Sequence, residues 1–322
     1  MSFFPLAAEM TDAARPRYDR SVLEFSFHDK ESAMAMILAA APVVEHELKK
    51  MQARCAALKA QNVTPTLKVI LVGEHAPSII YTNNKKKFCE KFGATCLIER
   101  LPATITADQL IQTIKSANQD PHIHGLMVQL PLPEPLAAVR PGLLIDPRKD
   151  VDGMTPWQHY HLQNKERHEQ DLIPCTPRGI VSLLNFYKIP LSGQRVVILG
   201  RSLIVGRPLA ALLTNYDATV TVCHTKTKNL AEITKAADII IVAIGHAHFL
   251  TPAYINPHHP PVIVDVGISY LAPHKIAGDA DFAALEPLVQ AISPVPGGVG
   301  PMTILSLGQN LLQATENALQ NA

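Results

Sequence analysis

A tyrosine and a lysine lie four residues apart in a stretch that reads S-I-I-Y-T-N-N-K-K-K from Ser78. In a helix, this spacing places Tyr81 and Lys85 on one face, with Ser78 one turn earlier. A phenol beside an amine offers an aromatic ring, a hydroxyl and a cation whose proton becomes labile when burial or a second cation lowers the lysine pKa. Lys86 and Lys87 are the expected source of that second cation. The alternative is a basic helix face turned to solvent.

Two further polar positions are candidates for the same site. Gln129 stands at the end of an apolar segment, Gly125–Leu130, where parallel sheets place ligand contacts. An amide there can orient a lysine without adding charge. The stretch K-D-V-D-G, residues 149–153, offers two carboxylates, Asp150 and Asp152, and a carboxylate accepts two N–H groups of a 2-amino-pyrimidinone edge side by side. A structural glutamine and an ordinary Asx turn are the alternatives.

A glycine-containing turn lies between an apolar segment, residues 195–199, and a predicted helix, and it reads G-R-S-L-I-V-G-R-P from Gly200. Glycines let a backbone approach the pyrophosphate of a dinucleotide, and the N-terminus of the next helix attracts its charge. The pattern departs from G-x-G-x-x-G, because Ser202 takes the place of the middle glycine and Gly206 comes one residue late. A plain tight turn is the alternative, and the strand–turn–helix context favours a nucleotide.

The end of the next predicted strand bears on the choice between NAD and NADP. NAD sites place an Asp or Glu about 20 residues after the glycine turn, where it accepts from the ribose 2′-hydroxyl. Here residues 223–228 read C-H-T-K-T-K, without a carboxylate. Arg201, Thr225 and Lys226 are instead suited to neutralise and hydrogen-bond a 2′-phosphate. The sequence therefore predicts NADP, with groups that simply face water as the alternative.

The segment from Pro294 to Thr303 reads P-V-P-G-G-V-G-P-M-T and combines three glycines with three prolines. A loop of this composition can lie against a flat ligand. It leads directly into the last predicted helix, so its amides are placed to serve an anion. A simple hinge is the alternative.

Length and composition bound the remaining possibilities. The chain has 322 residues, of which 47% are hydrophobic, with a net charge of +1. Single cores seldom grow past about 250–300 residues, so two domains are expected. The charge balance does not indicate a nucleic-acid or membrane-surface partner. The sequence has no run of about 18 apolar residues, so we expect no membrane span.

The five cysteines are scattered and include no C-x-x-C pair. This pattern argues against a disulfide framework or a structural zinc site and favours a reducing, cytoplasmic compartment. The 14 histidines form no H-x-x-x-H pattern, so we assign no metal. Residues 1–27 lack the apolar core of a secretory signal and are expected to form a loosely ordered extension.

Strands that are apolar on both faces alternate with helices along the chain. We predict strands over residues 66–72, 96–101, 125–130, 195–199, 219–223, 239–243 and 262–266. We predict helices over residues 32–60, 81–92, 107–117, 179–186, 205–215 and 305–318, and a further helix that begins at residue 229. Residues 153–171 are expected to form a polar connector. The pattern predicts parallel α/β sheets, the second of them doubly wound and nucleotide-binding.

Taken together, these stretches resemble the bifunctional methylenetetrahydrofolate dehydrogenase/methenyltetrahydrofolate cyclohydrolase family. The matching motifs occur in the family's order and are Ser78-x-x-Tyr81-x-x-x-Lys85-x-Lys87, Val128-Gln129-Leu130-Pro131-Leu132-Pro133, Lys149-Asp150-Val151-Asp152-Gly153, Pro174-Cys175-Thr176-Pro177, Gly200-Arg201-Ser202 to Pro208, Asp265-Val266-Gly267-Ile268 and Pro294 to Thr303. Thr82 departs from the family's usual valine, and the region before about Gln61 matches poorly.

The resemblance implies an N-terminal α/β catalytic domain and a Rossmann-like NADP-binding domain that face each other across a cleft, in a homodimer. The catalytic, folate-binding domain would comprise residues 28–152 and 305–322, and the NADP-binding domain residues 153–304. The implied catalytic residues are Lys85, Tyr81, Gln129 and Asp152. The implied folate contacts are Tyr81, Lys85, Val128, Gln129, Leu130, Asp152, Pro296, Gly297 and Gly298, and the implied NADP contacts are Gly200, Arg201, Ser202, Thr225 and Ile268.

The implied chemistry is the oxidation of 5,10-methylenetetrahydrofolate and hydrolysis of the product to 10-formyltetrahydrofolate, within the one-carbon metabolism that serves purine biosynthesis. Hydride leaves the methylene carbon for C4 of NADP⁺ and produces a methenyl cation. Water then adds to that cation, and a partly neutral Lys85 would assist the addition and the proton movements of ring opening.

Other function classes share parts of this pattern. A dehydrogenase without cyclohydrolase activity stays open within the family. A shikimate-type dehydrogenase also pairs a lysine and an aspartate with a nucleotide domain, but the segment 294–303 argues against it. Short-chain dehydrogenases use Tyr-x-x-x-Lys after their nucleotide turn, whereas here it comes before. A non-enzymatic folate- or nucleotide-binding protein would not need Lys85, Gln129 and Asp152 together.

Overall fold

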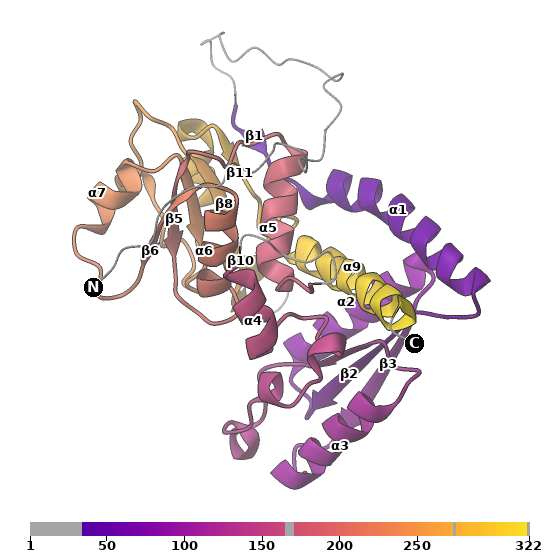
Figure 1. Ribbon diagram of the computed structural model, residues 1–322. Coiled ribbons are helices and arrows are strands. Elements are labelled where there is room, and N and C mark those ends of the chain that lie inside the picture. The colour runs from indigo at the N-terminus through magenta and orange to yellow at the C-terminus, as the bar shows by residue number, and fades with distance from the viewer. Residues whose placement is uncertain (1–33, 165–170, 273–274, 321–322) are drawn as a thin grey trace, which may run out of the picture. The chain divides into compact units, whose positions relative to one another are not determined.

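The computed structural model describes residues 34–164, 171–272 and 275–320 of the chain (Figure 1). The predicted extension, residues 1–27, lies outside the described residues, as does the predicted helix start at residue 32. Within the described ranges, none of the helices combines the length and apolar character that a membrane span requires.

The first sheet is parallel and has the strand order β3-β2-β4. It consists of β2 (Thr66–Val72), β3 (Thr95–Leu101) and β4 (Gly125–Val128), and the chain reaches β3 and β4 through α2 (Ala76–Phe92) and α3 (Ala107–Gln119). The central strand β2 is largely buried, which agrees with a nearly continuous apolar sequence. Thr106 caps α3 in a capping box with Gln109, as the sequence signal predicts.

The predicted first helix is shorter than expected. It begins at Ala40 rather than near Ser32, and forms α1 (Ala40–Ala60). The residues before it include a short strand, β1 (Met36–Ile37), which pairs with β11 (Ala291–Ile292) of the second sheet. The helix-favouring composition of this stretch is overridden there by backbone pairing to a distant strand.

The second sheet is a six-stranded parallel sheet with the order β1-β11-β8-β7-β5-β6. The elements of this part of the chain are β5 (Arg195–Leu199), α6 (Gly206–Asn215), β6 (Thr219–Cys223), α7 (Leu230–Lys235), β7 (Ile239–Val242), β8 (Val262–Asp265) and α8 (Phe282–Leu285). The chain goes from β5 to β6 on one side and then returns to β7 on the other, so the sheet is doubly wound with a switch point at β5. A separate hairpin, β9 (Ser269–Ala272) with β10 (Lys275–Ala277), follows β8.

The connector predicted over residues 153–171, of which 165–170 lie outside the described residues, contains a helix that was not predicted. This helix, α4 (Pro156–Leu162), begins where Thr155 accepts a hydrogen bond from the backbone N–H of Gln158. The next helix, α5 (Cys175–Phe186), starts earlier than the predicted residue 179.

The last helix, α9 (Val299–Gln320), also starts earlier than predicted. The prediction of a loop over residues 294–303 is therefore wrong for Val299–Thr303, since Gly300 and Pro301 lie in the first turn of the helix, where proline is tolerated. Helix α9 packs against α1, α2 and α5 (Figure 1). The domain boundaries at residues 152 and 304 stay a prediction.

Candidate active site

Lys85 and Gln129 meet at the carboxyl end of the first sheet. Lys85 lies on α2 and is 7% exposed. Its Nζ donates to Gln129 Oε1 at 2.7 Å, although the two residues are 44 positions apart. Gln129 follows β4 directly, and its Nε2 donates to the Leu130 carbonyl at 2.7 Å, which leaves Oε1 turned toward the lysine. A neutral acceptor therefore orients the amine.

Burial is the main cause that lowers the pKa of Lys85 below its ordinary value. The negative charge of Asp152 acts in the opposite direction and raises the same pKa. Lys86 and Lys87, which were expected to supply a neighbouring cation, are exposed on the helix. Desolvation, and not repulsion by a neighbouring cation, therefore lowers the pKa of Lys85.

Tyr81 lies one turn before Lys85 on α2, as the spacing predicts. The Lys85 Nζ stands 6.0 Å from the centroid of its ring. A Cβ on Gly300, in the first turn of α9, would lie 3.8 Å from the Tyr81 hydroxyl. Burial raises the pKa of Tyr81 above its ordinary value, so the phenol stays protonated and can donate a hydrogen bond at neutral pH.

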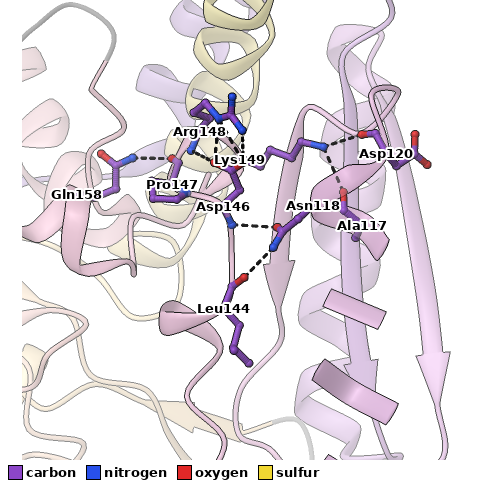
Figure 2. A network of polar contacts seen from close by, with 9 residues as sticks. All are labelled: Ala117, Asn118, Asp120, Leu144, Asp146, Pro147, Arg148, Lys149 and Gln158. Atoms are coloured by element: carbon purple, nitrogen blue, oxygen red, sulfur yellow. Dashed lines mark hydrogen bonds and ion pairs between the residues drawn. The ribbon is translucent and has the colours of Figure 1, made fainter. Parts of the chain in front are cut away.

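The turn that carries Asp152 is held at both ends. Figure 2 shows the Lys149 side chain reaching the end of α3, where Nζ donates to the carbonyls of Ala117 at 3.2 Å and Asp120 at 2.6 Å. The carboxylate of Asp150 is fully buried and accepts from the backbone N–H of Gly153 at 3.0 Å and Thr155 at 2.6 Å. The Asx-turn alternative therefore describes Asp150, whereas the half-buried Asp152 is the carboxylate that acts on Lys85.

The remaining expected folate contacts come from two short segments. Val128 is buried at the end of β4, and Leu130 is 41% exposed. Pro296 and Gly297 are exposed and Gly298 is buried. Gly297 has a φ of 104°, a value that favours glycine, and its carbonyl accepts from the N–H of Ala40 at the start of α1.

The turn from Gly200 to Gly206 is closely packed between β5 and α6. Gly200 has a φ of 120°, and a Cβ there would collide with the carbonyl oxygen of Ala243, at the end of β7. A Cβ on Gly206 would collide with the carbonyl of Gly200. Ser202, at the position of the missing middle glycine, accepts through its hydroxyl from the N–H of Val205 at 3.2 Å. It thereby stabilises the turn that precedes α6.

A pocket of about 510 Å³ opens beside this turn, between α6 and the edge strand β6. Its polar lining consists of Arg201, Arg207, His224, Gln163 and Thr214, and none of its described lining residues carries a carboxylate. Nδ1 of His224 accepts from the N–H of Lys226 at 3.1 Å, so in the neutral ring the proton is on Nε2. Arg201 and Thr225 are exposed. Two guanidinium groups, without a carboxylate among the described lining residues, are suited to bind a phosphate group.

Two family models match the chain. Residues 38–152 match the tetrahydrofolate dehydrogenase/cyclohydrolase catalytic domain, and residues 174–319 match the NAD(P)-binding domain of the same family. The bifunctional protein FolD of Ligilactobacillus salivarius is 45% identical over 262 residues, which cover 81% of this chain and 90% of that protein. The chain belongs to the tetrahydrofolate dehydrogenase/cyclohydrolase family.

Solved structures of the family agree with this assignment. The bifunctional FolD methylenetetrahydrofolate dehydrogenase/cyclohydrolase from Campylobacter jejuni is 39% identical, with a TM-score of 0.84 over 88% of this chain and 99% of that one. The FolD enzyme of Trypanosoma brucei, solved with NADP cofactor and an inhibitor, is 31% identical, with a TM-score of 0.84 over 89% of this chain and 99% of that one. The predicted family, two-domain α/β fold class and enzyme class are confirmed.

Two buried acids hold loops at the carboxyl end of the second sheet. Sequence reasoning did not single them out as functional, although Asp265 opens one of the matched motifs. Asp279 accepts from the N–H groups of Ile244, Gly245 and His246, which follow β7, at 2.7, 2.9 and 2.7 Å. Asp265 accepts from three further backbone N–H groups, including that of Gly267 at 3.2 Å. Burial raises the pKa of Asp265 to about 7.

These two acids fix the loops after β7 and β8, and the second of these loops carries the half-buried Ile268. Arg207 and His224 were also missed. Arg207 follows Gly206 directly in the sequence, so the glycine turn was the available signal for it.

Proposed function

We propose that the buried Lys85, held by Gln129, is the group that serves the hydrolytic reaction of this family member. The protein is an NADP-dependent methylenetetrahydrofolate dehydrogenase and methenyltetrahydrofolate cyclohydrolase. The observation that carries the residue assignment is the 2.7 Å hydrogen bond between Lys85 Nζ and Gln129 Oε1, on an amine whose pKa is lowered by burial. A lowered pKa increases the share of neutral amine, the form that can accept a proton, relative to a solvated lysine.

In this proposal, Lys85 transfers a proton from the water that attacks the methenyl carbon to N5. Water adds to the methenyl carbon, and the amine takes the proton that the water loses. The same proton is then available to N5 as the bond between N5 and that carbon breaks, while the added hydroxyl becomes the formyl oxygen and releases its proton to solvent. Gln129 accepts a hydrogen bond from either protonation state of the amine and keeps it in place.

The other folate-side residues bind and orient the substrate in this proposal. The carboxylate of Asp152 pairs with the 2-amino and N3 hydrogens of the pterin, for which two acceptor oxygens side by side are suited. The protonated hydroxyl of Tyr81 donates a hydrogen bond, and its ring offers a stacking face. Val128, Leu130, Pro296, Gly297 and Gly298 border the folate.

The second sheet supplies the cofactor contacts. When bound, NADP⁺ accepts the hydride from the methylene carbon. Gly200 lets the backbone approach the pyrophosphate, Ser202 keeps the turn before α6 in shape, and Ile268 lies on the loop after β8. The positive and acid-free lining of the pocket at Arg201 supports a 2′-phosphate there, with Thr225 at the end of β6 as a hydrogen-bonding partner.

We also infer a homodimer, a cytoplasmic location and a supply of one-carbon units to purine biosynthesis. The family resemblance supports the first and third, and five buried cysteine thiols support a reducing compartment. Light scattering of the purified protein is expected to give twice the chain mass, and a single chain mass would contradict the dimer.

Absorbance at the methenyl band tests the two activities together. Purified protein is mixed with methylenetetrahydrofolate and NADP⁺, with NAD⁺ in a parallel reaction. Methenyl compound should form with NADP⁺ and then decay faster than in buffer. Methenyl compound that forms and persists would remove the role of Lys85 in hydrolysis. A reaction that is equally fast with NAD⁺ would remove the phosphate role of Arg201.

A further inference from the structure

Asn310, on the last helix α9, is fully buried and contacts the turn that carries Asp152. Its side-chain Nδ2 donates to the carbonyl of Val151 at 2.8 Å and to the carbonyl of Ile173 at 2.8 Å. Its Oδ1 accepts from Arg178 Nη1 at 2.6 Å. Both amide hydrogens and the amide oxygen are therefore used by three different segments of the chain.

The carbonyl that Asn310 holds is next to Asp152 in sequence. The Val151 carbonyl also accepts from the Cys175 thiol at 3.1 Å, and the carbonyl of Asp152 accepts from the N–H of Cys175 at 3.3 Å. Val151 is itself fully buried, so its carbonyl has no access to water as an alternative partner. The backbone on both sides of the Asp152 side chain is thus fixed by buried groups.

The same turn is held from its other end by groups already described. Lys149 is bonded to the end of α3 (Figure 2), and Asp150 is committed to backbone N–H groups of Gly153 and Thr155. Residues 149–151 therefore use their polar groups to hold the turn in place. The carboxylate of Asp152 is left to act on Lys85 and on a ligand.

We propose that Asn310 is a positioning residue: by holding the Val151 and Ile173 carbonyls, it keeps the Asp152 carboxylate directed at Lys85 and at the pterin edge. This inference rests on the proposed function, because it assumes the roles given to Asp152 and Lys85. A planar amide suits the position because two donors and one acceptor are required together. A carboxylate has no donors, and an apolar side chain would remove one hydrogen bond from the Val151 carbonyl, which would keep the Cys175 thiol, and one from the Ile173 carbonyl.

The proposal predicts a change that a purely structural residue would not produce. The charge of Asp152 raises the pKa of Lys85 against the effect of burial. If loss of Asn310 lets Asp152 move away, the Lys85 pKa falls further and the neutral amine persists to lower pH. The acid-side inflection of cyclohydrolase kcat/KM should then move to lower pH, by about half a unit or more.

The test uses hydrolysis of the methenyl compound, which needs no NADP, in Asn310→Leu and in the gentler Asn310→Ala. We expect the shifted inflection together with a folate KM raised about tenfold, since a charged hydrogen bond to the pterin is weakened. Asn310→Ala should show the same changes at smaller size, because water can replace part of the amide. The matched control is Gln309→Leu, which removes a neighbouring buried amide that bonds Glu47 on α1 instead.

A double variant separates this inference from the proposed function. In an Asp152→Asn background, Asn310→Leu should cause no further shift of the inflection. An unshifted inflection in both Asn310 variants, or a shift that persists in the Asp152→Asn background, would overturn the positioning role. If Asp152→Asn alone leaves the folate KM and the inflection unchanged, the role proposed for Asp152 fails first.

Discussion

The proposed folate side and the proposed cofactor side of this enzyme differ in how far their side chains are buried. Lys85 is buried and already hydrogen-bonded to Gln129 before any ligand is considered. By contrast, Arg201 and Thr225, which come shortly after the ends of β5 and β6, are exposed. A preorganised group in a dry site acts strongly on chemistry, whereas exposed charges are screened and act mainly on affinity. Substitutions on the folate side should therefore change rates, and those on the cofactor side should change binding and specificity.

The largest effect is expected for Lys85→Met. Loss of the amine should reduce cyclohydrolase kcat by about 10²–10⁴-fold, the usual contribution of a positioned acid–base group. Dehydrogenase activity should fall less, because hydride transfer needs no proton from the lysine. The decay of methenyl absorbance measures the first, and NADPH formation the second. Lys86→Met is the matched control, since Lys86 is exposed on the same helix, and equal losses in both variants would contradict the role of Lys85.

Gln129→Glu should produce the next largest effect. It would place a negative charge where the neutral Oε1 now lies 2.7 Å from Lys85 Nζ. A carboxylate at that position raises the lysine pKa by about 1–3 units, so the acid-side inflection of cyclohydrolase should move to higher pH. At neutral pH the rate should fall about tenfold or more. The direction is opposite to that expected for Asn310→Leu, and a pH profile unchanged from the parent would show that Gln129 does not orient the amine.

Arg201→Gln tests the exposed side. Removing one guanidinium from the pocket should raise the KM for NADP⁺ about tenfold and leave kcat and the KM for NAD⁺ nearly unchanged. Binding of 2′-phosphorylated adenosine fragments, measured by calorimetry, should weaken in parallel and lose part of its salt dependence. Arg207→Gln should show a weaker form of the same change. An equal rise of KM for both cofactors would mean that Arg201 does not recognise the 2′-phosphate.

The smallest effect on activity is expected from Asp265→Asn. This variant is therefore tested by the pH dependence of its free energy of unfolding. Burial raises the pKa of Asp265 from an ordinary 3.8 to about 7 in the folded protein. Its contribution to stability is therefore full below about pH 4 and is lost as the pH rises through about 7. The free energy of unfolding of the parent should decline over this window relative to Asp265→Asn, in denaturant titrations at several pH values. Parallel curves would show that this acid does not titrate in the window.

Helices and strands with strong local signals could be predicted from the sequence almost to the residue. Strands 66–72, 195–199 and 219–223 have the predicted bounds, and Thr106 caps α3 as its capping signal indicates. One error reflects a distant partner, and the others concern helix starts, since α4 was missed although Thr155 caps it locally, and α5 and α9 begin earlier than predicted. Residues before Ala40 pair with β11 instead of extending the helix, and α4 interrupts a connector that has no clear period. Local propensity is a weak term when a sheet edge or a capping group competes.

The sequence by itself determined which groups are available: the Tyr81–Lys85 spacing, an amide at a strand end, an acid in a turn, and a glycine turn followed by a strand end without a carboxylate. These features follow from short-range geometry and from side-chain chemistry, which a chain carries locally. Only the tertiary structure decided that Lys85 is desolvated, that Asp150 holds its turn while Asp152 acts on Lys85, and that Asn310 reaches that turn from the last helix. Burial and contacts between distant segments depend on how the sheets and helices pack, and no local pattern encodes them.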